Sequence, residues 1–223
     1  MRKLVLFFMI AGLTLMVAGL CAAVDMAFEA EFADIIEEPM VVATSADAAA
    51  EGPEPVDPSR GSFVWVPGPP ATGGGGTGFI EFHIKIPVAG TYAIWGRVAA
   101  WDGNSDSFWV VWQPSDPDED PQETQNTEFR WGVAQGNEWH WDRINHWLNA
   151  GTFEREWDLS AGVTTLRIYT REDAAMLDSI FVTDNLADDE AEVGPRLPTD
   201  EDLTAVEPAD KLAVMWGAIR STR

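Results

Sequence analysis

The sequence predicts an all-β protein, an antiparallel β-sandwich followed by an acidic C-terminal tail. Short segments in which apolar and polar residues alternate recur between residues 80 and 183, and Gly, Pro or Asp bounds each of them. No long helical pattern separates these segments, which favours antiparallel pairing in a sandwich. The chain also has 11 tryptophans among its 223 residues, nearly all inside such segments. Together these observations give the fold class.

The N-terminus has the pattern of an export signal, which we place at residues 1–23. Arg2 and Lys3 precede a long apolar stretch, and small residues lead up to a cleavage site after Ala23. Cleavage there implies a secreted, periplasmic or extracellular protein, and it removes Cys21, the only cysteine. The alternative is an uncleaved anchor, because an apolar stretch of roughly 20 residues can span a bilayer.

The predicted sandwich domain covers residues 24–186. In its first clear strand, Ile80, Phe82 and Ile84 face one way while the polar residues between them face the other. The segment 107–112 is apolar on both faces, which indicates a central strand. The strands that we expect lie at residues 80–86, 91–99, 107–112, 139–144, 154–159, 164–170 and 177–183.

Glycine, proline and charge predict the connecting and terminal segments. Residues 51–58 and 67–78 are rich in Gly and Pro and are expected to be loops, as is the charged segment 116–125. Residues 187–223 read as an acidic linker with three prolines, followed by a short tail. The last part, 211–223, places apolar side chains at helical spacing, so it could form an amphipathic helix that contacts a protein partner.

Charge and motifs exclude several classes of function. The formal net charge of −23 repels phosphate backbones, so we expect no nucleic-acid binding, and nothing beyond the N-terminal signal indicates a membrane. The same charge favours solubility and attracts divalent cations. No Gly-x-Ser-x-Gly sequence occurs, and the three histidines lack zinc-ligand spacing. We therefore expect a protein that is not an enzyme.

Four sequence segments, taken together, resemble a known family. They are FEAE at 28–31, VAGTY at 88–92 leading into WGRV at 95–98, DGNSDSF at 102–108, and the segment 166–172 closing on LDSI at 177–180. In order and spacing they resemble the galactose-binding-like, jelly-roll β-sandwich of carbohydrate-binding modules, in particular families 6 and 35. The resemblance implies a secreted, non-catalytic module that binds a polysaccharide or glycan.

The resemblance also implies a structural calcium ion that joins the first strand to the last. The family's ligands map onto Glu29, Glu31 and Asp178. Calcium takes about 6–8 oxygen ligands, carboxylates among them, and two residues that are two positions apart share a face when they lie on one strand. On spacing alone, two solvated acids on an edge strand are the alternative to a metal site.

Aromatic side chains are the candidates for binding a sugar, because ligand sites combine flat apolar walls with a few polar groups. The segment 137–143 is richest in them, and Trp139 and Trp141 are expected to share a face. The candidate ligand-binding residues are Trp65, Trp101, Trp139, Trp141, Trp147 and Arg171. A tryptophan in a sandwich strand is more often core than binding surface, so these residues cannot all be ligand contacts.

One residue departs from the family pattern. The family's main cleft usually has an asparagine two residues before the closing aspartate, where this chain has Met176. Recognition is then mainly aromatic, or another face is used, or sugar binding has been lost. In the last case the chain would be an extracellular structural or adhesive scaffold. A binding module should expose two or more indoles on one surface, whereas a scaffold should bury them all.

Overall fold

The computed structural model describes residues 23–51, 57–68, 77–148 and 151–205. The predicted signal at 1–23, except for its last residue, and the predicted helix at 211–223 lie outside these ranges. In the described ranges, no helix is both long enough and apolar enough to cross a bilayer.

Most of the described chain forms strands, and the helices are short. The strands are β1 (Asp25–Glu29), β2 (Ile35–Glu37), β3 (Val41–Ala43), β4 (Phe63–Trp65), β5 (Phe79–Ile86), β6 (Gly90–Ala100), β7 (Ser107–Gln113), β8 (Arg130–Gly132), β9 (Gly136–Arg143), β10 (Asn145–Leu148), β11 (Gly151–Glu154), β12 (Trp157–Leu159), β13 (Gly162–Thr170) and β14 (Met176–Thr183). The α-helices are α1 (Ser45–Glu51), α2 (Pro121–Thr124), α3 (Glu190–Val193) and α4 (Asp200–Ala205), and the 3-10 turns are η1 (Ala30–Phe32), η2 (Ser59–Gly61) and η3 (Thr127–Phe129).

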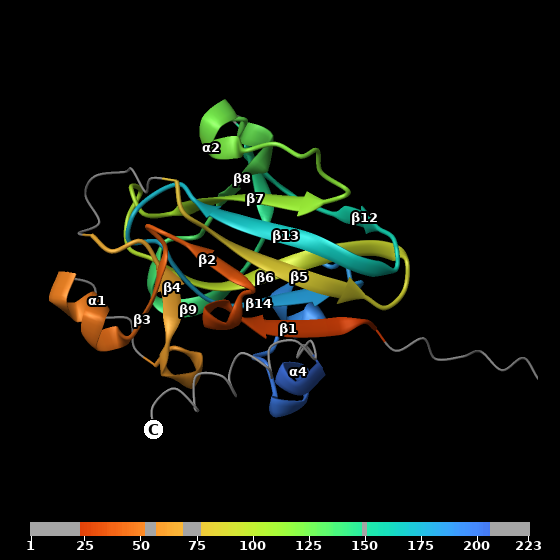
Figure 1. The fold of residues 1–223 in the computed structure, drawn as a ribbon, viewed down its shortest axis with the longest axis horizontal. Coiled ribbons are helices and arrows are strands. Elements are labelled where there is room, and N and C mark those ends of the chain that lie inside the picture. Colours follow the sequence, from red (N-terminus) through yellow and green to blue (C-terminus); the bar gives the residue numbers. More distant parts are fainter. Residues whose placement is uncertain (1–22, 52–56, 69–76, 149–150, 206–223) are drawn as a thin grey trace, which may run out of the picture.

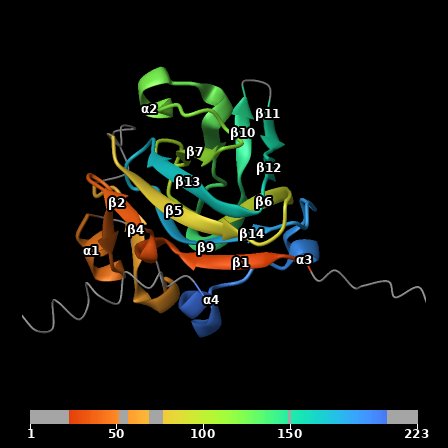
Figure 2. The same ribbon diagram turned by 45° about the vertical axis from the view of Figure 1, so that its right-hand side comes forward.

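The strands form two antiparallel sheets that pack face to face, which confirms the predicted sandwich (Figure 1). The larger, seven-stranded sheet has the order β12-β6-β14-β4-β3, with β1 beside β14 and β9 beside β6. The five-stranded sheet has the order β2-β5-β13-β7-β8. Strands β10 and β11 form a separate hairpin, which is drawn in the upper part of Figure 2 and contacts β8 and η3 through β10.

Six of the seven strands expected from the sequence coincide with β5, β6, β7, β9, β13 and β14. The seventh prediction, 154–159, is only partly right, because Glu154 ends β11 and β12 begins at Trp157. The loop expected at 116–125 contains the short helix α2. The strands that the sequence did not reveal have five or fewer residues, too few to show a clear alternation.

The core between the sheets is built from alternating apolar residues and large indoles. In β5, Ile80, Phe82, Ile84 and Ile86 are buried against the other sheet. Trp131 of β8 lies in the same core and is completely buried. Such a core stabilises the sandwich by about 25 cal/mol for each Å² of apolar surface removed from water.

A glycine in the middle of β6 makes room for one of these indoles. A Cβ atom added to Gly96 would lie 2.2 Å from Cη2 of Trp131. Glycine weakens a strand interior, and its presence there often marks a close approach of another group. The close packing of Trp131 therefore explains why residue 96 is a glycine.

A buried polar network closes one end of the sandwich. Oδ2 of Asp116 accepts hydrogen bonds of 2.8 Å from three donors: the backbone N–H of Trp112, Nη2 of Arg155 and Nε1 of Trp157. Burial lowers the pKa of Arg155, and the negative charge of Asp116 opposes that shift. Buried charges are tolerated when they are paired in this way.

The segment after β14 returns along the seven-stranded sheet. The buried guanidinium of Arg143 donates to the backbone oxygen of Leu186 at 2.9 Å and pairs with Asp188. Farther on, Asp200 of α4 lies 2.6 Å from Nη2 of Arg60, and α4 lies below β1 in Figure 1. The described part of the predicted linker therefore contains two short helices and contacts the sandwich.

We predict that Gly96→Ala lowers the free energy of unfolding by about 1–3 kcal/mol or more, because the new methyl group overlaps a fully buried ring. Urea denaturation followed by tryptophan fluorescence measures the change. The matched control is Gly90→Ala in the same strand, where the nearest atom to the added Cβ is 3.7 Å away. Equal effects of the two substitutions would contradict the account of the Trp131 contact.

Candidate functional site

The outer face of the seven-stranded sheet holds the sequence-predicted functional residues that the structure brings together. Strand β14 runs through this sheet and is paired with β6, with β4 near its start and with β1 over its second half. A register shift between Leu177 and Ser179 leaves Asp178 as the extra residue of the strand. Met176 lies beside one group of predicted functional residues, the tryptophans, and Asp178 lies beside another, the predicted calcium ligands.

Four aromatic residues, Phe63, Trp65, Trp101 and Trp139, pack beside the start of β14; we call them the aromatic cluster. The ring centroids of Phe63 and Trp65 are 5.8 Å apart, and those of Phe63 and Trp139 are 5.6 Å apart. Met176 packs against the same group. The aromatic cluster thus packs around Met176, the position at which the sequence departs from the family pattern.

The indole N–H groups of the aromatic cluster have no hydrogen-bond acceptor among the described residues. Trp65 is buried, whereas Trp101 and Trp139 are half-buried. The Nε1–H groups of all three are buried and find no acceptor among the described residues. A buried donor without a partner is costly, by about 1–3 kcal/mol. These three N–H groups are among the unpaired buried polar groups in the described ranges, which also include Nε1 of Trp95 outside the cluster.

Arg97 connects the aromatic cluster with the centre of β14. Its guanidinium carbon lies 5.5 Å from the ring centroid of Trp139, a cation–π distance. The same guanidinium pairs with the carboxylate of Asp178, whose side chain is completely buried. Arg97 therefore orients an aromatic wall and neutralises a buried acid at the same time.

The three predicted calcium ligands lie near one another, around the end of β1. Because β1 pairs with β14, Glu29 stands opposite Ser179, which confirms that the first and last strands are neighbours. Glu29 accepts from the hydroxyls of Ser59 and Ser179, both at 2.8 Å, and forms an ion pair with Nε of Arg60 at 3.2 Å. Asp178 accepts from the backbone N–H of Ser59 at 2.7 Å.

Glu31 corrects one expectation. It does not share a strand face with Glu29, because β1 ends at Glu29 and Glu31 lies in the 3-10 turn η1. Its Oε2 is buried and has no partner among the described residues. Burial raises the pKa of Glu31 to about 8, and the negative charges of Glu29 and Asp178 add to this rise. Burial likewise raises the pKa of Asp178 to about 6, although Arg97 opposes it.

The donors suit a hard cation, but the described side chains are not arranged as a metal site. Oxygen atoms of Glu29, Glu31 and Asp178 are the ligands that calcium prefers. Within the described ranges, however, no three His, Cys, Asp or Glu side chains are placed so that they could hold a metal ion. Glu29 and Asp178 are held by serine and arginine donors, and only Glu31 has an unpaired oxygen.

The remaining predicted ligand residues lie elsewhere. Trp141 is farther along β9, where its ring is 6.4 Å from that of Phe181. Trp147 stacks on Arg130, with 3.3 Å between the guanidinium carbon and the ring centroid. Arg171 donates to Ser107 Oγ at 2.6 Å and pairs with Glu172. Of the six candidates, the structure therefore brings together Trp65, Trp101 and Trp139.

A binding module is expected to expose two or more indoles on one surface, and a scaffold to bury them all. Six are buried: Trp65, Trp95, Trp109, Trp112, Trp131 and Trp157. Four keep part of their surface exposed: Trp101, Trp139, Trp141 and Trp147. Trp216 lies outside the described residues. The indoles are thus not all buried, and two of the four partly exposed ones share the aromatic cluster.

Sequence reasoning missed Phe63 and Arg97, which complete this region. Phe63 lies in the three-residue strand β4, which is too short to be recognised from alternation. Arg97 had a signal, because it occupies a position in an otherwise buried strand, where a charged residue needs a partner. That partner, Asp178, lies 81 residues away in the sequence.

No protein-family model matches the chain, and no curated protein sequence matches it significantly. Among solved structures, it is similar to a family 35 carbohydrate-binding module from Clostridium thermocellum, with a TM-score of 0.47 and 14% identity over 72% of this chain and 98% of that one. It is also similar to a family 6 module of Cellvibrio mixtus lichenase 5A in complex with cellotriose (TM-score 0.44, 17% identity, 70% of this chain and 94% of that one).

A third similar structure is the GH26-CBM35 β-(1,4)-mannanase of Podospora anserina, with a TM-score of 0.46 and 19% identity. The match covers 78% of this chain but 28% of the mannanase chain. The modules named in these structures come from the two families that the sequence segments resemble.

We predict that Arg97→Leu lowers the free energy of unfolding by about 3–5 kcal/mol in buffer that contains EDTA, because it leaves the buried Asp178 without its counter-charge. The matched control is Arg196→Leu, which removes a more exposed pair with Asp202 and should cost about 1 kcal/mol or less. Urea denaturation compares the two. An Arg97→Leu/Asp178→Asn double variant should recover part of the loss, and no recovery would contradict the assigned pairing.

Proposed function

We propose that this protein is a non-catalytic carbohydrate-binding module, and that the aromatic cluster binds a sugar of a polysaccharide or glycan. The observation that carries the proposal is the gathering of three indoles in one cluster, two of which, Trp101 and Trp139, keep part of their surface exposed. The partly exposed faces of Trp101 and Trp139 can stack on the apolar C–H surface of a sugar ring.

The arrangement of the cluster supports this choice. Trp101 comes from the loop that follows β6, and Trp139 from the strand β9, which pairs with β6. Their partly exposed rings are supported from below by Phe63 and the buried Trp65. Arg97 holds Trp139 in place through its guanidinium. Such preorganised walls reduce the entropy cost of binding.

The proposal also covers the location of the protein and its other partners. The chain is secreted, which rests on the signal pattern at residues 1–23 and accords with extracellular glycans as ligands. It does not bind nucleic acid, since its net charge is −23. The segment 211–223, whose apolar residues have helical spacing, is our candidate contact for a protein partner. A structural or adhesive scaffold without sugar binding remains the alternative function.

We predict that Trp139→Ala weakens glycan binding at least about tenfold, which corresponds to about 1.4 kcal/mol. A glycan array with the purified chain identifies the ligand, and calorimetry on that ligand measures the loss. The matched control is Trp141→Ala, which removes the same residue type from the same face of the same strand, away from the cluster. It should bind as the unchanged protein does.

Melting curves of both variants show whether each is folded. A fully buried tryptophan would cost about 3–5 kcal/mol on removal, and the half-buried Trp139 should cost less. If the unchanged, folded chain binds no glycan on the array, sugar binding is wrong and the scaffold function is favoured. If Trp141→Ala abolishes binding and Trp139→Ala does not, the binding site is on another part of the sheet.

We also propose that a calcium ion stabilises the junction of β1 and β14 through Glu29, Glu31 and Asp178. The support is the choice of hard oxygen donors and the buried, unpaired Oε2 of Glu31 beside two other acids. A bound cation would keep these carboxylates ionised and would relieve their mutual repulsion. Binding requires Glu29 and Asp178 to exchange donors that they now have, Arg60 among them.

We predict that calcium raises the melting temperature by linkage and that EDTA lowers it, with a stabilisation of about 2.7 kcal/mol when free calcium is 100 times its dissociation constant. Differential scanning calorimetry measures this shift. Glu31→Gln should abolish the response to calcium, whereas Glu192→Gln, in the exposed helix α3, should retain it. Identical curves with calcium and with EDTA would contradict a calcium ion at this junction.

A further inference from the structure

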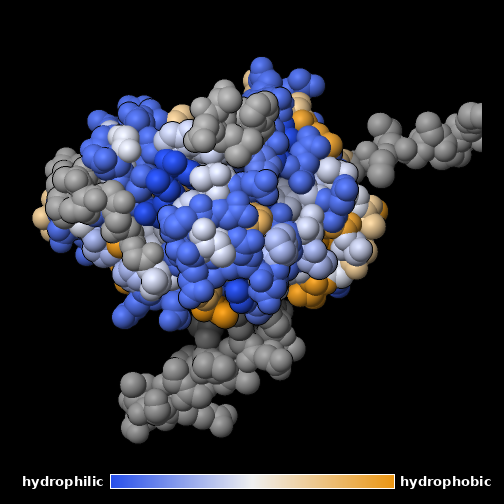
Figure 3. Space-filling view, turned by 90° about the horizontal axis from the view of Figure 1, so that it is seen from above, coloured by the Kyte–Doolittle hydropathy of each residue, from blue (hydrophilic) through white to orange (hydrophobic). Residues whose placement is uncertain are grey.

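Three buried acids have no part in the sites proposed above. Charged side chains ordinarily stay at the surface, which is mainly hydrophilic on the face seen from above (Figure 3). Six Asp and Glu residues of the described ranges are nevertheless buried; two are predicted calcium ligands, and Glu81 pairs with Arg167. The other three are Asp106, Glu172 and Asp173, each at most 6% exposed. A buried acid is stable only with a partner or a proton.

Two of these acids join two loops of the sandwich. Asp106 ends the loop between β6 and β7, and Glu172 lies in the loop between β13 and β14. Oε2 of Glu172 accepts from the backbone N–H of Asp106 at 3.1 Å and from the hydroxyl of Ser107 at 2.5 Å. The two acids therefore share one buried space, although they are 66 residues apart in the sequence.

Asp106 has one buried oxygen without a donor. Its Oδ2 accepts from Nε2 of Gln135 at 3.0 Å, whereas Oδ1 has no hydrogen-bond partner among the described residues. Burial raises the pKa of Asp106, and the negative charge of Glu172 adds to this rise. The hydrogen bond from Gln135 and the positive charge of Arg130 oppose it. A proton on Oδ1 turns that oxygen into a donor and leaves a single negative charge in the shared space.

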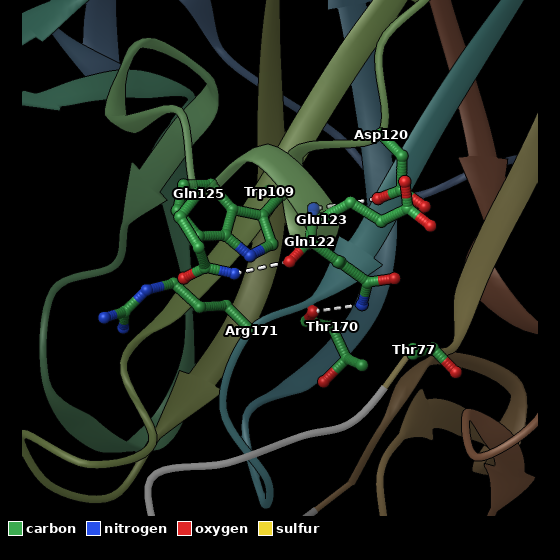
Figure 4. A pocket seen from close by; sticks show the side chains of 8 residues that line it. All are labelled: Thr77, Trp109, Asp120, Gln122, Glu123, Gln125, Thr170 and Arg171. Carbon is green, nitrogen blue, oxygen red and sulfur yellow. Dashed lines mark hydrogen bonds between the residues drawn. The ribbon is translucent and has the colours of Figure 1, made fainter.

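That remaining charge, on Glu172, already has its counter-charge. Arg171 pairs with Glu172 and donates to Ser107 Oγ at 2.6 Å. Figure 4 shows Arg171 beside Trp109, whose ring centroid is 5.6 Å from the guanidinium carbon. Asp106 itself has no ion pair in the described part of the chain. Ionisation of Asp106 would therefore set two negative charges against one paired guanidinium, and the two acids would repel each other.

Both loops carry residues of the aromatic cluster. Trp101 begins the loop that Asp106 ends, and Ala174 packs in the same cluster from the other loop. The backbone N–H of Ala174 donates to the backbone oxygen of Val66 at 3.1 Å, which ties this second loop to the end of β4. The bonds to Glu172 therefore attach the loop of Trp101 to a fixed part of the molecule.

The chain between Trp101 and Asp106 is short and internally bonded. The backbone oxygen of Asp102 accepts from the N–H of Ser105 at 3.1 Å, and Oδ1 of Asp102 accepts from the N–H of Asn104 at 2.9 Å. Such turns hold a loop in one shape. A displacement of Asp106 is therefore passed on to Trp101.

We propose that Asp106 and Glu172 are a positioning pair for Trp101, which holds the loop in place while Asp106 keeps its proton and loosens it when Asp106 ionises. Linkage gives the sign. An acid whose pKa is raised by folding stabilises the folded arrangement below its ordinary pKa of about 3.9, and this contribution is lost as the pH rises through the raised value. Weaker sugar binding at higher pH would follow, and that consequence rests on the proposed function.

NMR of the ¹⁵N-labelled full chain, without sugar and in EDTA, tests the positioning pair. The indole N–H signal of Trp101 reports on the loop and is followed from about pH 4 to about pH 8. We expect a titration of this signal that Asp106→Asn removes, because an amide does not ionise. The matched control is Asp102→Asn, which makes the same change in the same loop, keeps an acceptor for Asn104 and should retain the titration.

Two other buried acids titrate in this range, since burial raises the pKa of Asp178 to about 6 and that of Glu31 to about 8. The result is therefore the difference at Trp101 between the unchanged chain and Asp106→Asn. Glu172→Gln adds a second readout. It removes the repelling charge, so the titration should move to lower pH, whereas a merely structural role would leave its midpoint unchanged. Melting curves show that each variant is folded.

Sugar binding is measured separately, on a glycan array in EDTA at about pH 5 and about pH 8. A glycan found there should bind at least about threefold more weakly at the higher pH, because only molecules with the loop in place bind it. Asp106→Asn should reduce this ratio.

The positioning pair and the sugar-binding function fail in different ways. A titration of Trp101 that persists in Asp106→Asn, or that Asp102→Asn removes as well, would overturn the positioning pair whatever the array shows. If Asp106→Asn alone removes the titration and no glycan binds at either pH, the positioning pair stands and the sugar-binding function is wrong. A glycan that binds equally at both pH values would overturn the consequence drawn for binding.

Discussion

The position of β14 is the constraint on which both the fold and the candidate site depend. All eight of its residues are buried, and three other strands, β1, β4 and β6, pair with it along different parts of its length. The strand is therefore fixed on both edges and covered on both faces. Its outward side chains contact three groups of residues in turn. Met176 packs against the aromatic cluster, and Asp178 lies among the predicted calcium ligands. Phe181 packs against the rings near the C-terminal segment.

Electrostatics couples the first two of these neighbourhoods through Arg97. Its guanidinium balances a buried acid, and its flat face supports the indole of Trp139. Any cation that took over the charge of Asp178 would release Arg97 to adopt another orientation, and Trp139 would lose part of its support. A metal ion at the strand junction would therefore act on the aromatic cluster as well as on stability.

The sequence predicted the sandwich because its long strands alternate clearly, and their boundaries in β5, β7, β13 and β14 agree closely with those expected. It also placed the first strand beside the last. It could not show which tryptophans meet, since that depends on the pairing of β9 with β6 and of β4 with β14. The turn at Glu31 was missed because two acids at i and i+2 suit a strand as well as a 3-10 turn.

The unpaired indole donors also bear on the choice between a binding module and a scaffold. A buried N–H group without an acceptor costs about 1–3 kcal/mol, which is a large share of the about 5–15 kcal/mol by which a domain is stable. A scaffold gains nothing from three such groups in one place, because phenylalanine would fill the same volume without a donor. A ligand that opened the cluster and accepted from these buried N–H groups would offset a cost that folding leaves in place. This asymmetry between tryptophan and phenylalanine is the physical reason to favour recognition over mere support.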